Sequence, residues 1–138
     1  MIRALKITTL VALIGGAAAT VRYSGVWRDL PKLQGVIGVL FVCSPLFLFW
    51  AAAALGRHAV PIALTLCAAL FAICAGISGY HDAFWSDHRS DINGIVLIYV
   101  PAVQGVIGLL ALVGGFVDWL IYRRRHRFGG RPTYSRGT

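Results

Sequence analysis

Residues 80–91, YHDAFWSDHRSD, hold the densest group of side chains capable of chemistry in this chain. Histidine and aspartate bind zinc or copper, and histidine also titrates near physiological pH. The candidate ligands, all weak, are His81, Asp82, Asp87 and His88. Their spacing matches no known zinc motif, so a solvated loop with aromatic anchors is the favoured interpretation. A metal or pH-sensing site is the alternative, and no cofactor is expected.

Three cysteines, Cys43, Cys67 and Cys74, fall inside long apolar runs. Cys67 and Cys74 are seven residues apart and share a helix face, which with Cys43 would offer thiolates to a soft metal. We do not favour this site, because a cysteine in an apolar segment usually behaves as a small hydrophobe. Catalytic serine motifs, phosphate loops and metalloprotease helices are absent from the sequence, so an enzyme is not expected.

The elements that position these residues are predicted to be membrane spans. The chain has 138 residues, of which 58% are hydrophobic and 13% charged, with a mean hydropathy of +0.75. A soluble domain of this size cannot bury so much apolar surface. A helix that crosses the roughly 30 Å hydrocarbon core needs about 20 apolar residues, and such runs lie near 4–22, 32–55, 59–79 and 92–122. The predicted fold is an all-α membrane protein with four transmembrane helices.

One segment occurs twice, as PKLQGVIGVL at 31–40 and PAVQGVIGLL at 101–110, with seven of ten positions identical. Both copies follow a Tyr, a short spacer and Trp-x-Asp. The duplication predicts two similar helical hairpins, 1–57 and 58–122, in one transmembrane domain. Helices one and three run in the same direction, so the repeat is parallel, with its axis along the membrane normal. The first run resembles a secretory signal, but cleavage would remove half of the repeat, and we favour an uncleaved helix.

The second copy carries an insertion, residues 88–100, where the first has only Leu30. Either the fourth helix is unusually long, with a kink at Pro101, or residues 92–100 lie along the membrane surface. We favour the long helix.

Small and polar residues recur at helical spacing within the spans. In lipid the hydrophobic effect does not drive helices together. Association therefore depends on close approach of the backbones and on polar side chains that form hydrogen bonds between helices. The residues expected to act in helix packing or partner binding are Gln34, Gly38, Gln104, Gly108, Ala111 and Gly115. Comparable seams are Thr65, Ala68, Ala72, Ala75 and Gly79 in the third run, and Thr8, Ala12, Gly15 and Ala19 in the first. In an alternative interpretation Gln34 and Gln104 form a pseudo-symmetric substrate site.

Basic residues are unevenly distributed between the two ends of the spans. Nine of the thirteen fall at the termini or at Arg57, which by the positive-inside rule places both termini in the cytoplasm and residues 80–91 in an outer loop. Residues 123–138 form a basic tail, in which Arg123, Arg124, Arg125 and Arg127 are expected to contact anionic lipids. Asp118 is expected to pair with Arg123 to Arg125. Nucleic acid is not an expected partner, because no nucleic-acid-binding fold is indicated.

No Asp, Glu, Lys, Arg or His lies near the middle of any predicted span, which weighs against ion-coupled transport. The sequence therefore favours a small multi-pass protein of the bacterial inner membrane. It is expected to be an accessory subunit or protective binding partner of another membrane protein, or to associate with itself. A small oligomeric channel or transporter, and a metal-handling protein based on residues 80–91, are the alternatives.

Overall fold

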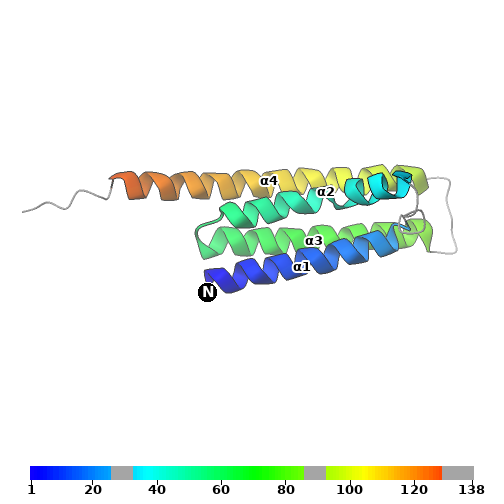
Figure 1. Cartoon of the computed structure of the whole chain (residues 1–138), viewed down its shortest axis with the longest axis horizontal. Coiled ribbons are helices and arrows are strands. Elements are labelled where there is room, and N and C mark those ends of the chain that lie inside the picture. The colour runs from blue at the N-terminus through cyan, green and yellow to red at the C-terminus, as the bar shows by residue number, and fades with distance from the viewer. Residues whose placement is uncertain (26–32, 86–92, 129–138) are drawn as a thin grey trace, which may run out of the picture.

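The computed structural model describes residues 1–25, 33–85 and 93–128, with the backbone alone for 33–35, 93–94 and 127–128. Its helices are α1 (Ile2–Tyr23), α2 (Leu33–Leu55), α3 (Ala59–Phe84) and α4 (Asn93–Phe128), arranged side by side (Figure 1). All four are long and apolar enough to cross a membrane. The prediction of four long apolar helices is confirmed, and it indicates a multi-pass membrane protein.

The helices alternate in direction along the bundle. Met1, the turn between α2 and α3, and the end of α4 all lie at one end, which we call the basic end (Figure 1). The most extensive interface joins α2 and α4, and α1 packs against α2 and α3. Within the described residues α1 and α4 do not touch. The α1–α2 hairpin therefore packs against the α3–α4 hairpin. In this arrangement α1 lies beside α3 and α2 lies beside α4, and the two helices of each such pair run in the same direction.

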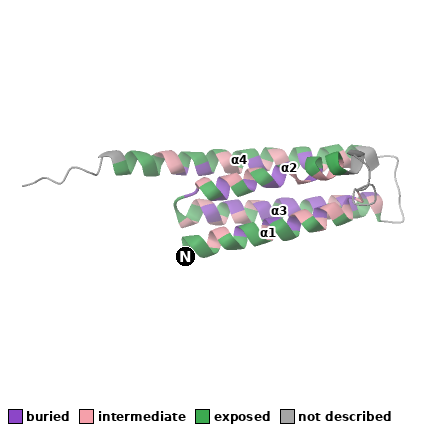
Figure 2. Ribbon diagram, viewed as in Figure 1, coloured by how far each residue is buried: buried purple, intermediate pink, exposed green. Residues whose placement is uncertain are grey.

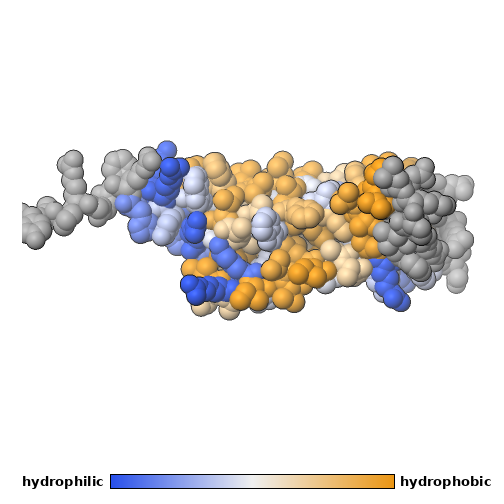
Figure 3. Space-filling view, viewed as in Figure 1, coloured by the Kyte–Doolittle hydropathy of each residue, from blue (hydrophilic) through white to orange (hydrophobic). Residues whose placement is uncertain are grey.

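The interior of the bundle is apolar. Its core cluster consists of Leu13, Leu46, Phe49, Ala69, Ala72 and Ile73. The buried positions follow the inward faces of the helices (Figure 2), while large apolar side chains cover the middle of the outer surface and hydrophilic residues gather at the basic end (Figure 3). An apolar exterior between polar ends is the surface that a hydrocarbon layer requires.

Two glycines set the close approach of α4 to α2. A Cβ atom on Gly108 would lie 2.9 Å from Leu48 Cβ and 3.2 Å from the carbonyl oxygen of Pro45. A Cβ atom on Gly115 would lie 2.6 Å from the carbonyl oxygen of Ala52. Both glycines lie on the α4 face that packs against α2, where close backbone contact replaces side-chain packing.

Pro45 interrupts the hydrogen-bond ladder inside α2. Proline has no N–H, so the carbonyl of Phe41, four residues earlier, loses its helical donor. The hydroxyl of Ser44 donates to that carbonyl at 2.8 Å. A neighbouring side chain thus supplies the missing bond, as transmembrane helices with internal proline require.

The two copies of the repeated segment lie at different depths. Gly108 packs beside Pro45, which comes seven residues after Gly38, the counterpart of Gly108 in the first copy. The copies are therefore offset along the bundle by about 10 Å, at 1.5 Å per residue. The described part of the insertion, residues 93–100, is helical, because α4 is one helix from Asn93 with Pro101 inside it. The favoured long helix is thus confirmed for residues 93–100.

The predicted seam of the first helix is wrong by one position. The buried residues of α1 are Thr9, Leu13, Gly16 and Thr20, not Thr8, Ala12, Gly15 and Ala19. Threonine can be buried here because its hydroxyl bonds to its own helix: Thr9 donates to the Leu5 carbonyl at 2.8 Å and Thr20 to the Gly16 carbonyl at 2.7 Å.

The predicted end of the third helix is also wrong. Residues 80–84, assigned to the outer loop, are the last residues of α3. They continue its buried face, since Tyr80 is fully buried and Ala83 is 8% exposed. Packing of these two side chains extends the helix beyond the apolar run.

Candidate functional site

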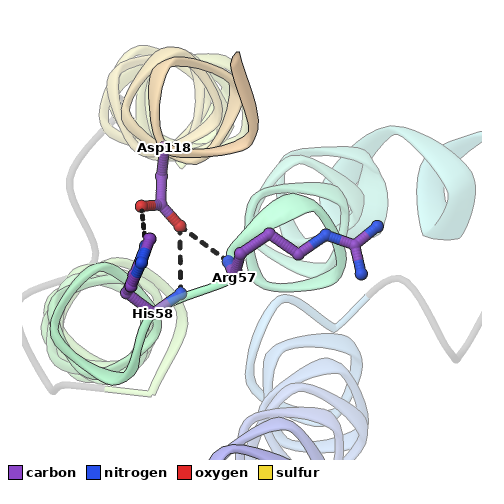
Figure 4. Close-up of polar contacts among 3 residues, drawn as sticks. All are labelled: Arg57, His58 and Asp118. Carbon is purple, nitrogen blue, oxygen red and sulfur yellow. Dashed lines mark hydrogen bonds and ion pairs between the residues drawn. The ribbon is translucent and has the colours of Figure 1, made fainter. Parts of the chain in front are cut away.

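A carboxylate on α4 binds the turn that leads into α3 (Figure 4). Oδ2 of Asp118 accepts hydrogen bonds from the backbone N–H groups of Arg57, at 2.6 Å, and of His58, at 3.1 Å. Oδ1 lies 2.5 Å from Nδ1 of His58. The N-cap residue of α3 is His58, whose side chain makes no capping bond. Asp118 therefore supplies, from another helix, the acceptor and negative charge that a helix N-terminus favours.

The predicted pairing of Asp118 with Arg123 to Arg125 is wrong. In the described chain its ion-pair partner is His58. Asp118 is 8% exposed, on the buried seam of α4, whereas Arg123, Arg124 and Arg125 are exposed. Arg123 and Arg124 lie on other faces of α4, and Arg125 is two turns away, so none has the i, i+3 or i, i+4 spacing that brings side chains together on a helix.

Basic and aromatic side chains surround this cap. The guanidinium of Arg57 lies 5.8 Å from the centre of the Tyr122 ring, and that of Arg123 lies 5.2 Å from the Trp119 ring. Both are within cation–π range. The ammonium of Lys6 donates to the carbonyl of Ala54, in the last turn of α2, at 2.9 Å. The side chain of Arg127 lies outside the described residues.

A shallow groove runs between α3 and α4 along most of the bundle. It consists of two hollows of about 380 and 260 Å³, which share Ile107. About half of its lining residues are small: Thr65, Ala68, Ala72, Ala75, Gly76, Gly79, Ala111, Gly114 and Gly115. The five residues of the predicted α3 seam are all among them. Because small side chains form its floor, the groove leaves room for a neighbouring helix.

Gln104 lies at the floor of this groove. Its Nε2 donates to the carbonyl of Ala72 at 2.9 Å, and its side chain rests directly on Gly76. Gln104 Oε1 and the hydroxyl of Tyr80 are the buried side-chain polar atoms without a partner in the described residues. The side chain of Gln34 lies outside those residues, so no joint site of the two glutamines is described.

The other predicted packing residues fall at internal contacts. Gly108 and Gly115 face α2, and Ala111 packs against the core cluster. Gly38 is half-buried.

The candidate metal ligands are only partly described. Nδ1 of His81 lies 3.6 Å from Oδ1 of Asp82, with their side chains 56% and 82% exposed. Asp87 and His88 lie outside the described residues, so a site that includes them stays a prediction. Within the described ranges no three potential ligands come together. Cys67 and Cys74 are exposed, and Cys43 is half-buried.

Sequence reasoning missed the Asp118 cap, although one signal for it is present. The turn GRH, residues 56–58, offers no Ser, Thr, Asp or Asn to cap the helix that follows. A helix that begins without its own cap requires an acceptor from elsewhere, and Asp118 is the only carboxylate within a predicted span.

In comparisons with known proteins, no family model, curated protein or solved structure matches the chain. The class of protein is thus defined by its own geometry, as a four-helix multi-pass membrane protein with a basic end.

Proposed function

We propose that this protein binds another membrane protein, as an accessory subunit or protective partner, and that the α3–α4 groove receives a transmembrane helix of that partner. The observation that carries the proposal is the groove itself, which is lined by small residues and open to lipid. Its rim bears large exposed side chains, among them Leu64, Phe71 and Leu110. A small-residue floor and a bulky rim suit the packing of an incoming helix.

The apolar interior also supports a binding role over a transport role. The core side chains fill the centre of one copy, and the described charged residues lie toward the helix ends. Ion paths and proton relays normally place ionisable groups inside the membrane.

The proposed location is the bacterial inner membrane, with both termini in the cytoplasm. The positive-inside rule supports this orientation, since nine of thirteen basic residues belong to the same side as the termini. Four of the five aspartates belong to the opposite side.

The test uses two glycines that differ only in location. A Cβ atom added at Gly114 or at Gly15 would have no neighbouring atom within 4 Å, so a side chain at either position begins in open space. Gly114 lines the groove, and Gly15 is exposed on α1. Photo-crosslinkers at Leu64 and Phe71 in native membranes should join one discrete partner, and Gly114→Leu should abolish the adduct while Gly15→Leu preserves it.

A crosslinker at Val11, exposed on α1, controls for random collisions in the membrane. Equal crosslinking from Val11 and Phe71, or loss of the adduct in both glycine variants, would contradict the groove as a docking site. Mass spectrometry of the adduct identifies the partner, and an adduct with a second copy of this chain would show self-association instead.

A further inference from the structure

A second groove runs between α1 and α2. It consists of two hollows of about 190 and 270 Å³, which share Leu10 and Trp50. The groove begins at Lys6, near the basic end, and reaches Ala17 in the middle of the bundle. That interval spans about 16 Å at 1.5 Å per residue. One leaflet occupies about half of the roughly 30 Å hydrocarbon core, so the groove has the length of an acyl chain in one leaflet.

The walls of this groove are apolar and open to lipid. Leu10, Ile14, Phe47 and Trp50 line it, and their exposed fractions range from 43% to 65%. Its small lining residues are Thr9, Ala17, Ala53 and Ala54, a smaller share of the lining than in the α3–α4 groove, and the rest is mainly bulky side chains. This surface suits a flexible hydrocarbon chain better than the backbone of another helix.

Two basic residues, Lys6 and Arg57, belong to the end of the groove that is nearest the basic end. The ammonium of Lys6 uses one of its three donors on the Ala54 carbonyl. Arg57 is exposed in the turn, three residues after the Ala54 carbonyl that Lys6 contacts. Figure 4 shows that the Arg57 side chain points away from Asp118.

No acid neutralises this pair within the described residues. Asp118 is the acid of the basic end there, and its oxygens are taken up by the α2–α3 turn and His58. Two basic side chains at one end of a groove, with no carboxylate counter-ion in the described residues, attract an anion.

We propose that an anionic glycerophospholipid occupies the α1–α2 groove, with its phosphate between Lys6 and Arg57 and one acyl chain along Leu10, Ile14 and Trp50. Three properties of the groove fit the same ligand: the basic residues at its end, its apolar walls and its length. The proposal does not depend on a protein partner at the α3–α4 groove.

Trp50 provides the readout, because bromine atoms on a lipid chain quench nearby tryptophan fluorescence. The full chain is reconstituted in phosphatidylcholine vesicles with increasing fractions of dibrominated phosphatidylglycerol, and dibrominated phosphatidylcholine serves as the neutral probe. Quenching by the anionic lipid should saturate at a low fraction, and Trp50→Phe should remove this saturating component. Lys6→Gln with Arg57→Gln should weaken the apparent affinity on the order of tenfold or more, from about fivefold per basic residue.

The matched control is Arg131→Gln with Arg136→Gln, which removes the same charge from the basic tail but not from the four residues expected to contact lipid. This control variant should retain the saturating quenching of Trp50 by dibrominated phosphatidylglycerol. Equal loss in both double variants would show a general surface potential and overturn the site. Equal quenching by the two brominated lipids in the parent protein would also overturn it, as would displacement by free glycerol 3-phosphate at equal concentration. Thermal unfolding of each variant verifies that it is folded.

Discussion

Asp118 is a single side chain that joins three elements, because α4 carries it and its oxygens hold the turn that links α2 to α3. We expect Asp118→Asn to lower the free energy of unfolding by about 1–3 kcal/mol, since it weakens charge-assisted bonds to a helix N-terminus. Thermal or denaturant unfolding in mild detergent measures the change. Asp82→Asn, at a side chain that is 82% exposed, is the control. Equal unfolding midpoints for both variants would contradict the capping role.

Ser44 is expected to stabilise the protein only because Pro45 follows it. Ser44→Ala removes the donor to the Phe41 carbonyl, which should cost about 0.6 kcal/mol, the average for such bonds in a membrane protein. Pro45→Ala restores a backbone N–H to the same carbonyl. In a double-mutant cycle the cost of Ser44→Ala should therefore vanish in the Pro45→Ala background. An unchanged cost there would mean that Ser44 acts in some other way.

Which residues share a helix face is easier to predict from sequence than which residues they bind. The spacing of Gln104, Gly108 and Asp118 places them on one helix face, which follows from sequence alone. The partners of Asp118 depend on which turn of another helix lies at the same depth, and hydropathy does not determine that. Proximity in sequence therefore favours Arg123 to Arg125, whereas the structure gives Asp118 the turn at Arg57 and His58.

At the scale of the helix, the α2–α4 contact depends on the missing side chain at Gly115. Gly115→Ala places a methyl group 2.6 Å from the backbone oxygen of Ala52, and a backbone atom cannot move aside without shifting the helix. Overpacking of this kind should cost about 1–3 kcal/mol. Gly114→Ala, at a position with nothing within 4 Å, should be neutral or stabilising. Similar unfolding midpoints in detergent for these neighbours would show that close α2–α4 packing does not determine stability.

The existence of each helix follows from hydropathy, but the helix ends do not. The apolar run of α3 stops before His81 and Asp82, and that of α4 before Arg123, yet both helices continue to Phe84 and Phe128. A helix needs internal hydrogen bonds rather than lipid, so it can extend beyond the membrane. The register of α1 was missed by one residue because a span that is apolar on every side has no polar face to orient it.

For the whole molecule, the distribution of charge predicts orientation. A reporter fused after Thr138 should be active only in the cytoplasm, and one inserted at Gly25 only outside, because basic residues flanking short loops are retained on the inner side. The structure places Met1 and the end of α4 together (Figure 1), so reporters at the two termini must agree. A reporter at Gly25 that is accessible from the cytoplasm would reverse the orientation and move the basic end outside.

A substitution at Gln104 tests whether the whole molecule is a binding protein or a transporter. A transporter would need a polar path near this buried amide, so Gln104→Leu would abolish flux. In a binding protein the side chain contributes one hydrogen bond, to Ala72, and its Oε1 has no partner among the described residues.

We therefore expect Gln104→Leu to change the free energy of unfolding by less than about 1 kcal/mol, because the lost bond is partly offset by removal of a buried, unpaired acceptor. Purified parent protein and variant should both be silent in liposome flux assays, since the core cluster fills the centre of the bundle. Partner crosslinking through Phe71 should persist in the variant. Flux in the parent protein that disappears in Gln104→Leu at an unchanged unfolding midpoint would instead establish transport, with the repeated glutamine in its path.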